Sequence, residues 1–201
     1  MNDRHQGTHL ASSLAILHPL EPLTAEEITA AVKIVRRHCN VNEHVRFVSV
    51  NLHEPPKEVV LNFQEGDAIK REAFIVLHDP TTGAAYEAIV SLSEGEVTTW
   101  HYLPGIQPPI LFEELAKTEE LLKAHPDFQA VLQKRGIRDL DLVMVDVWSP
   151  GYYEDEKIQA RRILRAFVYM RYEQSDNAYA HPIEGIAALV DINRSNAWST
   201  S

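Results

Sequence analysis

The sequence is short of cysteine, of long apolar runs and of positive charge, and each shortage narrows what the chain can be. Its one cysteine, Cys39, leaves no partner for an intrachain disulfide and no cysteine metal cluster within one subunit. The longest apolar run near the start, residues 14–17, is too short for a signal-peptide core, and no stretch approaches the length of a membrane span. We therefore expect a soluble, cytoplasmic protein without a membrane partner.

The shortage of positive charge bears on possible partners. Nineteen basic and 29 acidic side chains give a formal net charge of -10, which repels a phosphate backbone. Nucleic acid is therefore not expected as a partner. A small cation such as an amine would be attracted by this field, although acidity that serves only solubility explains the same charge.

Several motifs of common enzymes are also missing. The sequence contains no GxGxxG, no Walker loop, no GxSxG and no CxxC, which leaves nucleotide, dinucleotide and common nucleophile chemistry without support. What remains is an ordinary globular composition, with 45% hydrophobic and 24% charged residues. A chain of this kind can bury a core, and its 201 residues allow one domain or two small ones. We predict two.

The first half of the sequence predicts one helix followed by strands. Thr24 and Glu27 form a capping box, in which each side chain accepts a hydrogen bond from the other residue's backbone at the start of a helix. Apolar residues then recur at helical spacing, which predicts one buried stripe consisting of Ile28, Ala31, Val32, Val35 and Cys39. Strands are predicted over residues 44–52, 58–63, 70–79, 85–92 and 96–103.

The second half repeats this plan after LPGIQPP at 103–109, where three prolines and a glycine predict a domain boundary. Two short helices are predicted over 110–125 and 126–136, with Leu111, Leu115 and Leu122 on one side of the first. Strands are predicted over 140–148, 161–172 and 184–192. The second of these strands should turn one face inward, made of Leu164, Ala166, Val168, Met170 and Tyr172.

The predicted fold class is therefore α+β, with two small domains that each place helices on an antiparallel sheet. The expected limits are a tail at 1–16, domains at 17–103 and 104–195, and a second tail at 196–201. The two plans are about one small domain length apart, roughly 90 residues. No close sequence repetition accompanies them.

Four groups of polar residues are candidates for chemistry. His5 and His9 have i, i+4 spacing but lie in the expected tail and lack the Glu of HExxH. WSPGYYEDE at 148–156 could hold a small cation or be an ordinary exposed loop. The arginines of QARRILR at 159–165 could clamp a carboxylate or phosphate, or make a domain or subunit contact.

The fourth group is NAYAHPIEG at 177–185, in which His181 resembles a catalytic residue. Its proline favours an extended backbone at His181, and its glycine permits a bend before an apolar strand. Nothing within the chain supplies an identifiable nucleophile or an oriented base partner for His181. A structural role as the turn leading into the strand is therefore the favoured interpretation.

Taken together, six segments resemble the N-terminal region of copper amine oxidases. They lie in family order, at 18–28 (HPLEPLTAEEI), 50–60 (VNLHEPPKEVV), 71–79 (REAFIVLHD), 86–97 (YEAIVSLSEGEV), 134–151 (KRGIRDLDLVMVDVWSPG) and 179–192 (YAHPIEGIAALVDI). The resemblance implies the two small, cystatin-like domains called N2 and N3 that precede the catalytic domain. It covers nearly all of the chain after the tail.

The resemblance also implies what the chain would not do alone. Family enzymes oxidise primary amines to aldehydes with release of ammonia and hydrogen peroxide, using copper and a topaquinone formed from an Asn-Tyr-Asp/Glu motif. Copper is held by a His-x-His pair and a distant histidine. The sequence contains neither an Asn-Tyr dipeptide nor a His-x-His. We therefore expect no cofactor, no metal and no catalytic residue in these 201 residues.

By resemblance, the second domain helps to wall the channel through which amines reach the quinone. Tyr179 best matches a channel position, whereas Leu115 and Ile137 lie in less distinctive surroundings. The implied partners are the catalytic domain in the same chain or a second copy in a homodimer, and the implied substrate of the parent is a primary amine. The alternative is a stand-alone module of the same fold that binds a small ligand or a protein.

Overall fold

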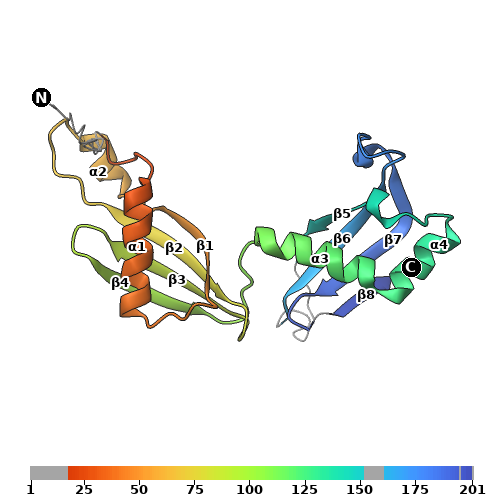
Figure 1. Ribbon diagram of the computed structural model, residues 1–201. Coiled ribbons are helices and arrows are strands. Elements are labelled where there is room, and N and C mark those ends of the chain that lie inside the picture. The colour runs from red at the N-terminus through yellow and green to blue at the C-terminus, as the bar shows by residue number, and fades with distance from the viewer. Residues whose placement is uncertain (1–17, 152–160, 195, 201) are drawn as a thin grey trace, which may run out of the picture.

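The computed structural model describes residues 18–151, 161–194 and 196–200 as two α+β domains. Figure 1 shows the domains side by side, joined by the segment between β4 and α3. Each domain has its own four-stranded antiparallel sheet with the strands in sequence order. The predicted fold class is confirmed. The predicted tail at 1–16 lies outside the described residues.

The first domain consists of α1 (Ala25–His38), β1 (Arg46–Leu52), α2 (Lys57–Asn62), β2 (Glu72–Asp79), β3 (Ala84–Ser91) and β4 (Glu96–Leu103). Helix α1 begins with the predicted capping box. The hydroxyl of Thr24 accepts from the Glu27 N–H at 3.2 Å, and the carboxylate of Glu27 accepts from the Thr24 N–H at 2.8 Å. These two bonds satisfy donors that a helix start leaves without partners.

The core of the first domain lies between α1 and one face of its sheet (Figure 1). Helix α1 contributes Ala31 and Val35, and the sheet contributes Ala73, Ile75, Leu77, Ala88 and Val90. Burying a valine or isoleucine side chain of this kind contributes about 1.5–3 kcal/mol. The predicted stripe is narrower than expected, because Ile28 is exposed and Cys39, at the end of α1, is only partly buried. Partial burial raises the pKa of the Cys39 thiol.

Residues 58–63 were predicted as a strand, and this prediction is wrong. Residues 57–62 form the short helix α2, which contains no buried residue. Pro56 directly precedes the helix, and its carbonyl accepts the N–H groups of Val59 and Val60, which closes the first turn. Strand β2 pairs directly with β1, so a strand at 58–63 would have no place between them. The apolar run of α2 stays on the surface, with Leu61 exposed.

The second domain consists of α3 (Phe112–Ala124), α4 (Pro126–Lys134), η1 (Leu140–Leu142), β5 (Val143–Trp148), β6 (Ile163–Met170), η2 (Ala178–Ala180), β7 (Pro182–Asp191) and β8 (Asn196–Thr200). Here η denotes a short 3-10 helix. The predicted tail at 196–201 is wrong for residues 196–200, which pair with β7 as the last strand of the sheet. Residues 196–200 form a strand because their backbone pairs with β7. Their short, polar sequence has little strand propensity that could have predicted this.

The second core lies between α3, α4 and one face of the sheet formed by β5–β8 (Figure 1). Its members include Leu122, Phe128 and Leu132 from the helices and Leu164, Ala166, Val168, Ala188 and Val190 from the strands. The predicted alternation in β6 holds at Leu164, Ala166 and Val168. It fails at Tyr172, which lies beyond the end of β6 and is exposed.

On α3 the prediction of a leucine side is only partly correct. Leu122 is buried, but Leu111 and Leu115 are only partly buried. The fully covered line of this helix is made of Glu114, Thr118 and Leu122 instead. None of the helices in the described parts of the chain is long and apolar enough to cross a bilayer.

Candidate functional site

The segment NAYAHPIEG forms a capped turn that leads into β7. The side chain of Asn177 accepts a hydrogen bond from the Tyr179 N–H at 3.2 Å, which starts η2, and β7 begins at Pro182. The carbonyl of His181 accepts from the Met170 N–H at 3.0 Å, so the turn closes the connection between β6 and β7. These contacts agree with the structural role favoured from the sequence, in which the segment forms the turn that leads into the strand.

His181 nevertheless has an oriented partner, which corrects the expectation that the chain supplies none. Its Nε2 lies 3.1 Å from a carboxylate oxygen of Asp176, and its ring lies 4.4 Å from the ring of Tyr172. The same carboxylate accepts from the Tyr172 N–H at 3.1 Å. That backbone bond, helped by the nearby His181, holds the pKa of Asp176 below its ordinary value against the opposing effect of burial. Asp176 thus ties both sides of the turn together.

Tyr179 is an exposed aromatic residue of this turn. Its exposed fraction is 58%, and the edge of its ring packs against Tyr169 of β6 with 5.1 Å between ring centres. Edge-to-face pairs of this kind stabilise a ring without covering it. More than half of Tyr179 therefore remains exposed to solvent at the end of the sheet where β6 meets β7.

Of the other two predicted channel residues, Ile137 lies toward the same end of the sheet as Tyr179, and Leu115 lies toward the opposite end. Ile137 follows α4 and packs on the second core, and Arg135 of the same segment donates to the carbonyls of Glu184 and Gly185 at the start of β7. Ile137 and Tyr179 therefore belong to the same end of the sheet. Leu115 lies beside Glu114, which binds Arg162 at the opposite end of β6. The length of β6 separates the two ends, roughly 23 Å at 3.3 Å per residue.

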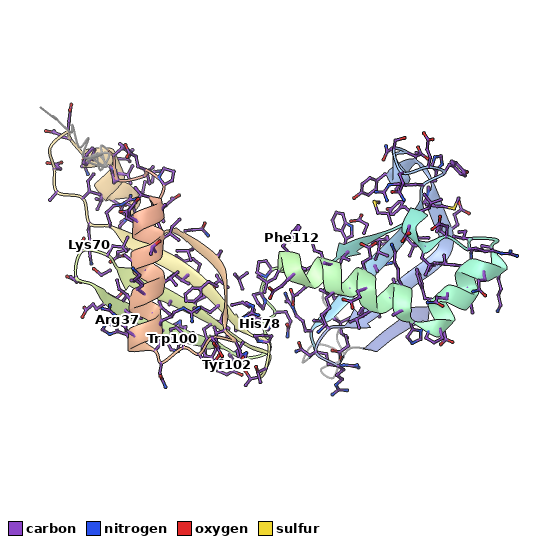
Figure 2. All side chains as sticks on the ribbon, in the orientation of Figure 1. Arg37, Lys70, His78, Trp100, Tyr102 and Phe112 are labelled. Atoms are coloured by element: carbon purple, nitrogen blue, oxygen red, sulfur yellow. The ribbon has the colours of Figure 1, made fainter. Side chains whose placement is uncertain are left out.

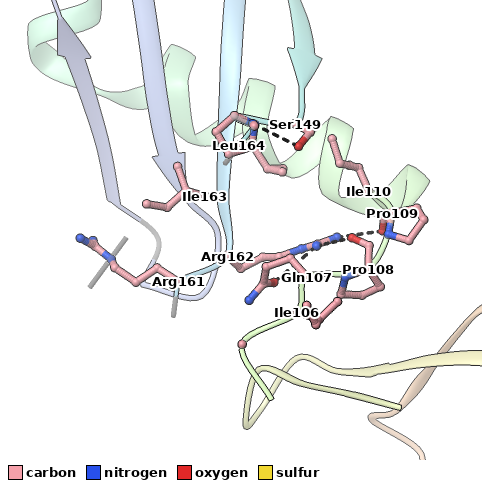
Figure 3. Close-up of a pocket in the computed structure, with 13 residues that line it drawn as sticks. Ile106, Gln107, Pro108, Pro109, Ile110, Ser149, Arg161, Arg162, Ile163 and Leu164 are labelled. Atoms are coloured by element: carbon pink, nitrogen blue, oxygen red, sulfur yellow. Dashed lines mark hydrogen bonds between the residues drawn. The ribbon is translucent and has the colours of Figure 1, made fainter. Parts of the chain in front are cut away.

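The arginines of QARRILR serve the fold. Arg162 has an exposed fraction of 3% and binds both carboxylate oxygens of Glu114, at 2.9 and 2.7 Å. Figure 3 shows its guanidinium reaching the linker, where it donates to the carbonyls of Pro108 and Pro109 at 2.6 and 2.9 Å and approaches Gln107 at 3.5 Å. All five donors of the guanidinium are used by these contacts, so none is left for a carboxylate or phosphate ligand.

The cavity beside this arginine, of about 410 Å³, is lined by the linker residues 105–110, by residues 149–151 and by residues 161–164. Burial opposes ionisation of Glu114 most strongly, yet hydrogen bonds from Arg162 and from the Leu111 N–H hold its pKa below the ordinary glutamate value. The neighbouring arginines are also engaged. Arg161 binds Asp191 at 2.7 Å, and Arg165 lies 4.7 Å from the centre of the Phe167 ring.

The remaining candidates lie mostly outside the part of the chain that the structure describes. Residues 152–160, which hold most of WSPGYYEDE, lie outside the described residues, as do His5 and His9. Trp148 is exposed and donates to Asp146 at 2.8 Å. Across residues 18–151, 161–194 and 196–200, no three histidine, cysteine, aspartate or glutamate side chains are grouped so as to hold a metal ion.

Two family profiles match the chain. The profile described as "AGAO-like N2 domain" matches residues 24–99, and the profile described as "Copper amine oxidase, N3 domain" matches residues 113–197. The two matches follow each other along the chain and correspond to the two sheets with their helices.

Similar proteins are amine oxidases. A "Primary amine oxidase" of Arthrobacter sp. (strain P1) is 40% identical over 181 residues, which are 90% of this chain and 27% of that protein. The "Diamine oxidase [copper-containing] 1, peroxisomal" of Nicotiana tabacum is 34% identical over 229 aligned positions, covering 95% of this chain and 29% of that protein. The chain thus spans under a third of the length of these relatives.

A solved structure shares the fold. The copper-containing benzylamine oxidase from Hansenula polymorpha matches with a TM-score of 0.73 and 19% identity, over 91% of this chain and 30% of that chain. At this identity the likeness concerns the fold alone.

Proposed function

Because this chain belongs to the copper amine oxidase family through its N2 and N3 domains, we propose that it is the non-catalytic N-terminal region of a copper- and topaquinone-dependent primary-amine oxidase. The observation that carries the proposal is the order of the two domain matches, which together account for residues 24–99 and 113–197. The parent reaction would convert a primary amine to an aldehyde with release of ammonia and hydrogen peroxide. Copper and the quinone would reside in a catalytic domain that the relatives' additional length accommodates.

Within such an enzyme, the proposed role of the second domain is to wall the path of the amine. The exposure of Tyr179 supports this role, since a protonated amine is attracted to the face of an aromatic ring. Ile137 belongs to the same end of the sheet, where it packs on the second core. Leu115 lies at the far end of the sheet, so we assign its proposed contact to a different part of the channel wall.

The second proposed role is to pack against the catalytic domain in the same chain. Large apolar side chains are exposed on both domains, among them Leu61, Phe112 and Trp148. Exposed apolar side chains of this kind are expected where another domain or subunit covers them. A stand-alone module would instead be expected to have a closed, polar surface. Alternatively, two copies of the chain could associate through the same surfaces. Light scattering of the 201-residue chain measures its mass in solution and so distinguishes a dimer from a monomer.

The non-catalytic part of the proposal is tested by measuring hydrogen peroxide. The purified chain is incubated with copper and with tyramine, phenethylamine or benzylamine, beside an active amine oxidase as the positive control. We expect no peroxide above a copper-only blank. Robust turnover by the 201-residue chain would contradict the proposal.

The channel role needs a complete enzyme. Residues 24–197 can replace the matched region of the Arthrobacter primary amine oxidase, whose identity to this chain makes a folded chimera realistic. We expect Tyr179→Ala in the chimera to change KM values among amines several-fold at unchanged copper and quinone content. Tyr102→Ala, which removes a similarly exposed tyrosine from the first domain, is the matched control. Identical KM values for the two variants would refute the channel role.

A further inference from the structure

The two domains meet at a small contact built from the start of β1, the end of β2 and the turn before β3. On the other side lie the start of α3 and the turn after β7. Arg46 binds Glu113 across this contact at 2.7 Å, although both side chains are largely exposed. Residues of both domains line a cleft of about 340 Å³ here, among them Arg46, His78, Glu113, Glu114 and Lys117.

His78 is the buried polar group of this contact. Figure 2 shows it at the end of the first domain that faces the second domain, and its exposed fraction is 1%. Its Nδ1 lies 3.3 Å from the carbonyl oxygen of Ala84, which places the ring proton on Nδ1. Nε2 then presents a lone pair to the buried contact, and it has no hydrogen-bond partner among the described residues.

The charges around His78 do not favour a second proton on the ring. Arg162 and Glu114 both act on it from the second domain, and the repulsion by Arg162 is stronger than the attraction by Glu114. Asp79 adds a weaker attraction from the same strand, while Arg46, Glu113 and Lys117 line the cleft. Burial is the largest single influence, and together with Arg162 it lowers the pKa of His78.

We propose that His78 is a proton-sensitive lock between the two domains: the closed arrangement is stable while its imidazole is neutral, and the domains separate when Nε2 takes up a proton. In the closed arrangement, an imidazolium would be buried beside Arg162, while both oxygens of Glu114 already accept hydrogen bonds. Separation of the domains would return His78 to water, where the charged ring is solvated. The lock concerns the relation between the domains and does not depend on the proposed amine oxidase function.

The size of the effect follows from proton linkage. A histidine exposed in the open arrangement titrates near pH 6.5, whereas the closed arrangement resists protonation. Between pH 7.5 and pH 5.5, the ratio of open to closed molecules should therefore rise by up to about tenfold, the limit reached when the closed arrangement takes up no proton. The neighbouring carboxylates remain charged in this range, because hydrogen bonds outweigh burial and hold the pKa values of Asp79 and Glu114 below their ordinary values.

The test measures the distance between the domains at each pH. Donor and acceptor dyes are placed on Lys33→Cys in α1 and Lys134→Cys in α4, both exposed positions, in a Cys39→Ser background. Single-molecule energy transfer then counts open and closed molecules, and far-UV circular dichroism confirms that both domains stay folded. With the native histidine, we expect the ratio of open to closed molecules to rise between pH 7.5 and 5.5, by up to about tenfold.

Two substitutions decide whether His78 is responsible. His78→Phe keeps a ring of similar size without a titrating group, so its open fraction should not change with pH. His101→Phe replaces an exposed histidine of the same domain and should follow the native curve. A flat native curve, or coinciding curves for the native chain and His78→Phe, would overturn the proposal. If His78→Phe does not fold, His78→Gln takes its place with the same expectations.

Discussion

At the scale of single residues, the same clamp is built once in each domain. In the first domain, Arg71 binds both oxygens of Glu27 at 2.9 Å and donates to the carbonyls of Glu21 and Pro22. In the second, Arg162 binds both oxygens of Glu114 and donates to the carbonyls of Pro108 and Pro109. Each glutamate also caps the first helix of its domain, so each arginine fastens the helix start to the segment before it.

Removing one arginine of this kind should be costly. Arg162→Gln leaves the buried Glu114 carboxylate without its counter-charge and two linker carbonyls without donors. We expect the free energy of unfolding to fall by about 3–5 kcal/mol, measured by urea denaturation. Arg46→Gln breaks an ion pair that is largely exposed and should cost at most about 1 kcal/mol. Equal losses in the two variants would contradict the role assigned to Arg162.

The clamps also predict how stability depends on acid. Hydrogen bonds from the arginines hold the pKa values of Glu27 and Glu114 below the ordinary glutamate value, with burial opposing them. Stability from these pairs is therefore fully present above the unfolded-state pKa, near 4.3, and is lost as the pH falls through the lowered folded values. Urea denaturation between pH 6 and pH 3 should show a steeper loss for the native chain than for the double variant Glu27→Gln, Glu114→Gln. Parallel curves would show that other carboxylates dominate.

At the scale of elements, the clamps show that the two domains correspond strand by strand. Arg71 and Arg162 each directly precede the second strand of their sheet, and their carbonyls accept from Leu92 and Ile192, which directly follow the third. In the sequence, only the common order of helices and strands is apparent. The correspondence was hidden because the capping residues differ in type, with Thr24 in one domain and Leu111 in the other.

The start of α1 offers a test of capping at this scale. Thr24→Ala removes the hydroxyl that accepts from the Glu27 N–H, and we expect a loss of about 1 kcal/mol in the free energy of unfolding. Thr29→Ala is the matched control within α1, because Thr29 is exposed and alanine is the better helix former. Chemical denaturation of both variants provides the comparison. A loss at Thr29 as large as that at Thr24 would argue against the cap.

At the scale of the whole molecule, the two domains have separate cores joined by a small polar contact. The two clusters of buried residues share no member. Their connection consists of the linker that Arg162 binds, the Arg46–Glu113 pair and the cleft around His78. A contact of this size lets each domain keep its own stability, and the proposed lock acts on the contact alone.

Core substitutions should therefore act within one domain. Leu132→Ala leaves a cavity in the second core and should cost that domain about 2–5 kcal/mol. Hydrogen exchange followed by mass spectrometry should show faster exchange in β5–β7 and unchanged exchange in β2 and β3. Val35→Ala in α1 is the reciprocal control and should affect the first domain only. Faster exchange in both domains for either variant would show that they unfold as one unit.

Local sequence determined most of the fold of this protein. Neighbours along the chain set the capping box of α1, the alternation in β6 and the repeated order of helix then strands. Short motifs and periodicity were therefore sufficient to predict these features. The apolar run at 58–63 misled the prediction, because its place outside the sheet depends on β2 pairing with β1.

Only the tertiary structure decided the contacts between residues far apart in sequence. It pairs Arg162 with Glu114, gives His181 the Asp176 carboxylate, separates Leu115 from Tyr179 and buries His78 between the domains. Local propensity cannot specify such contacts, because a polar side chain reveals its partner only when the fold has brought the two together and excluded water. The sequence by itself thus determined the elements and the family resemblance, and the packing of the elements decided which charged groups are buried and what they hold.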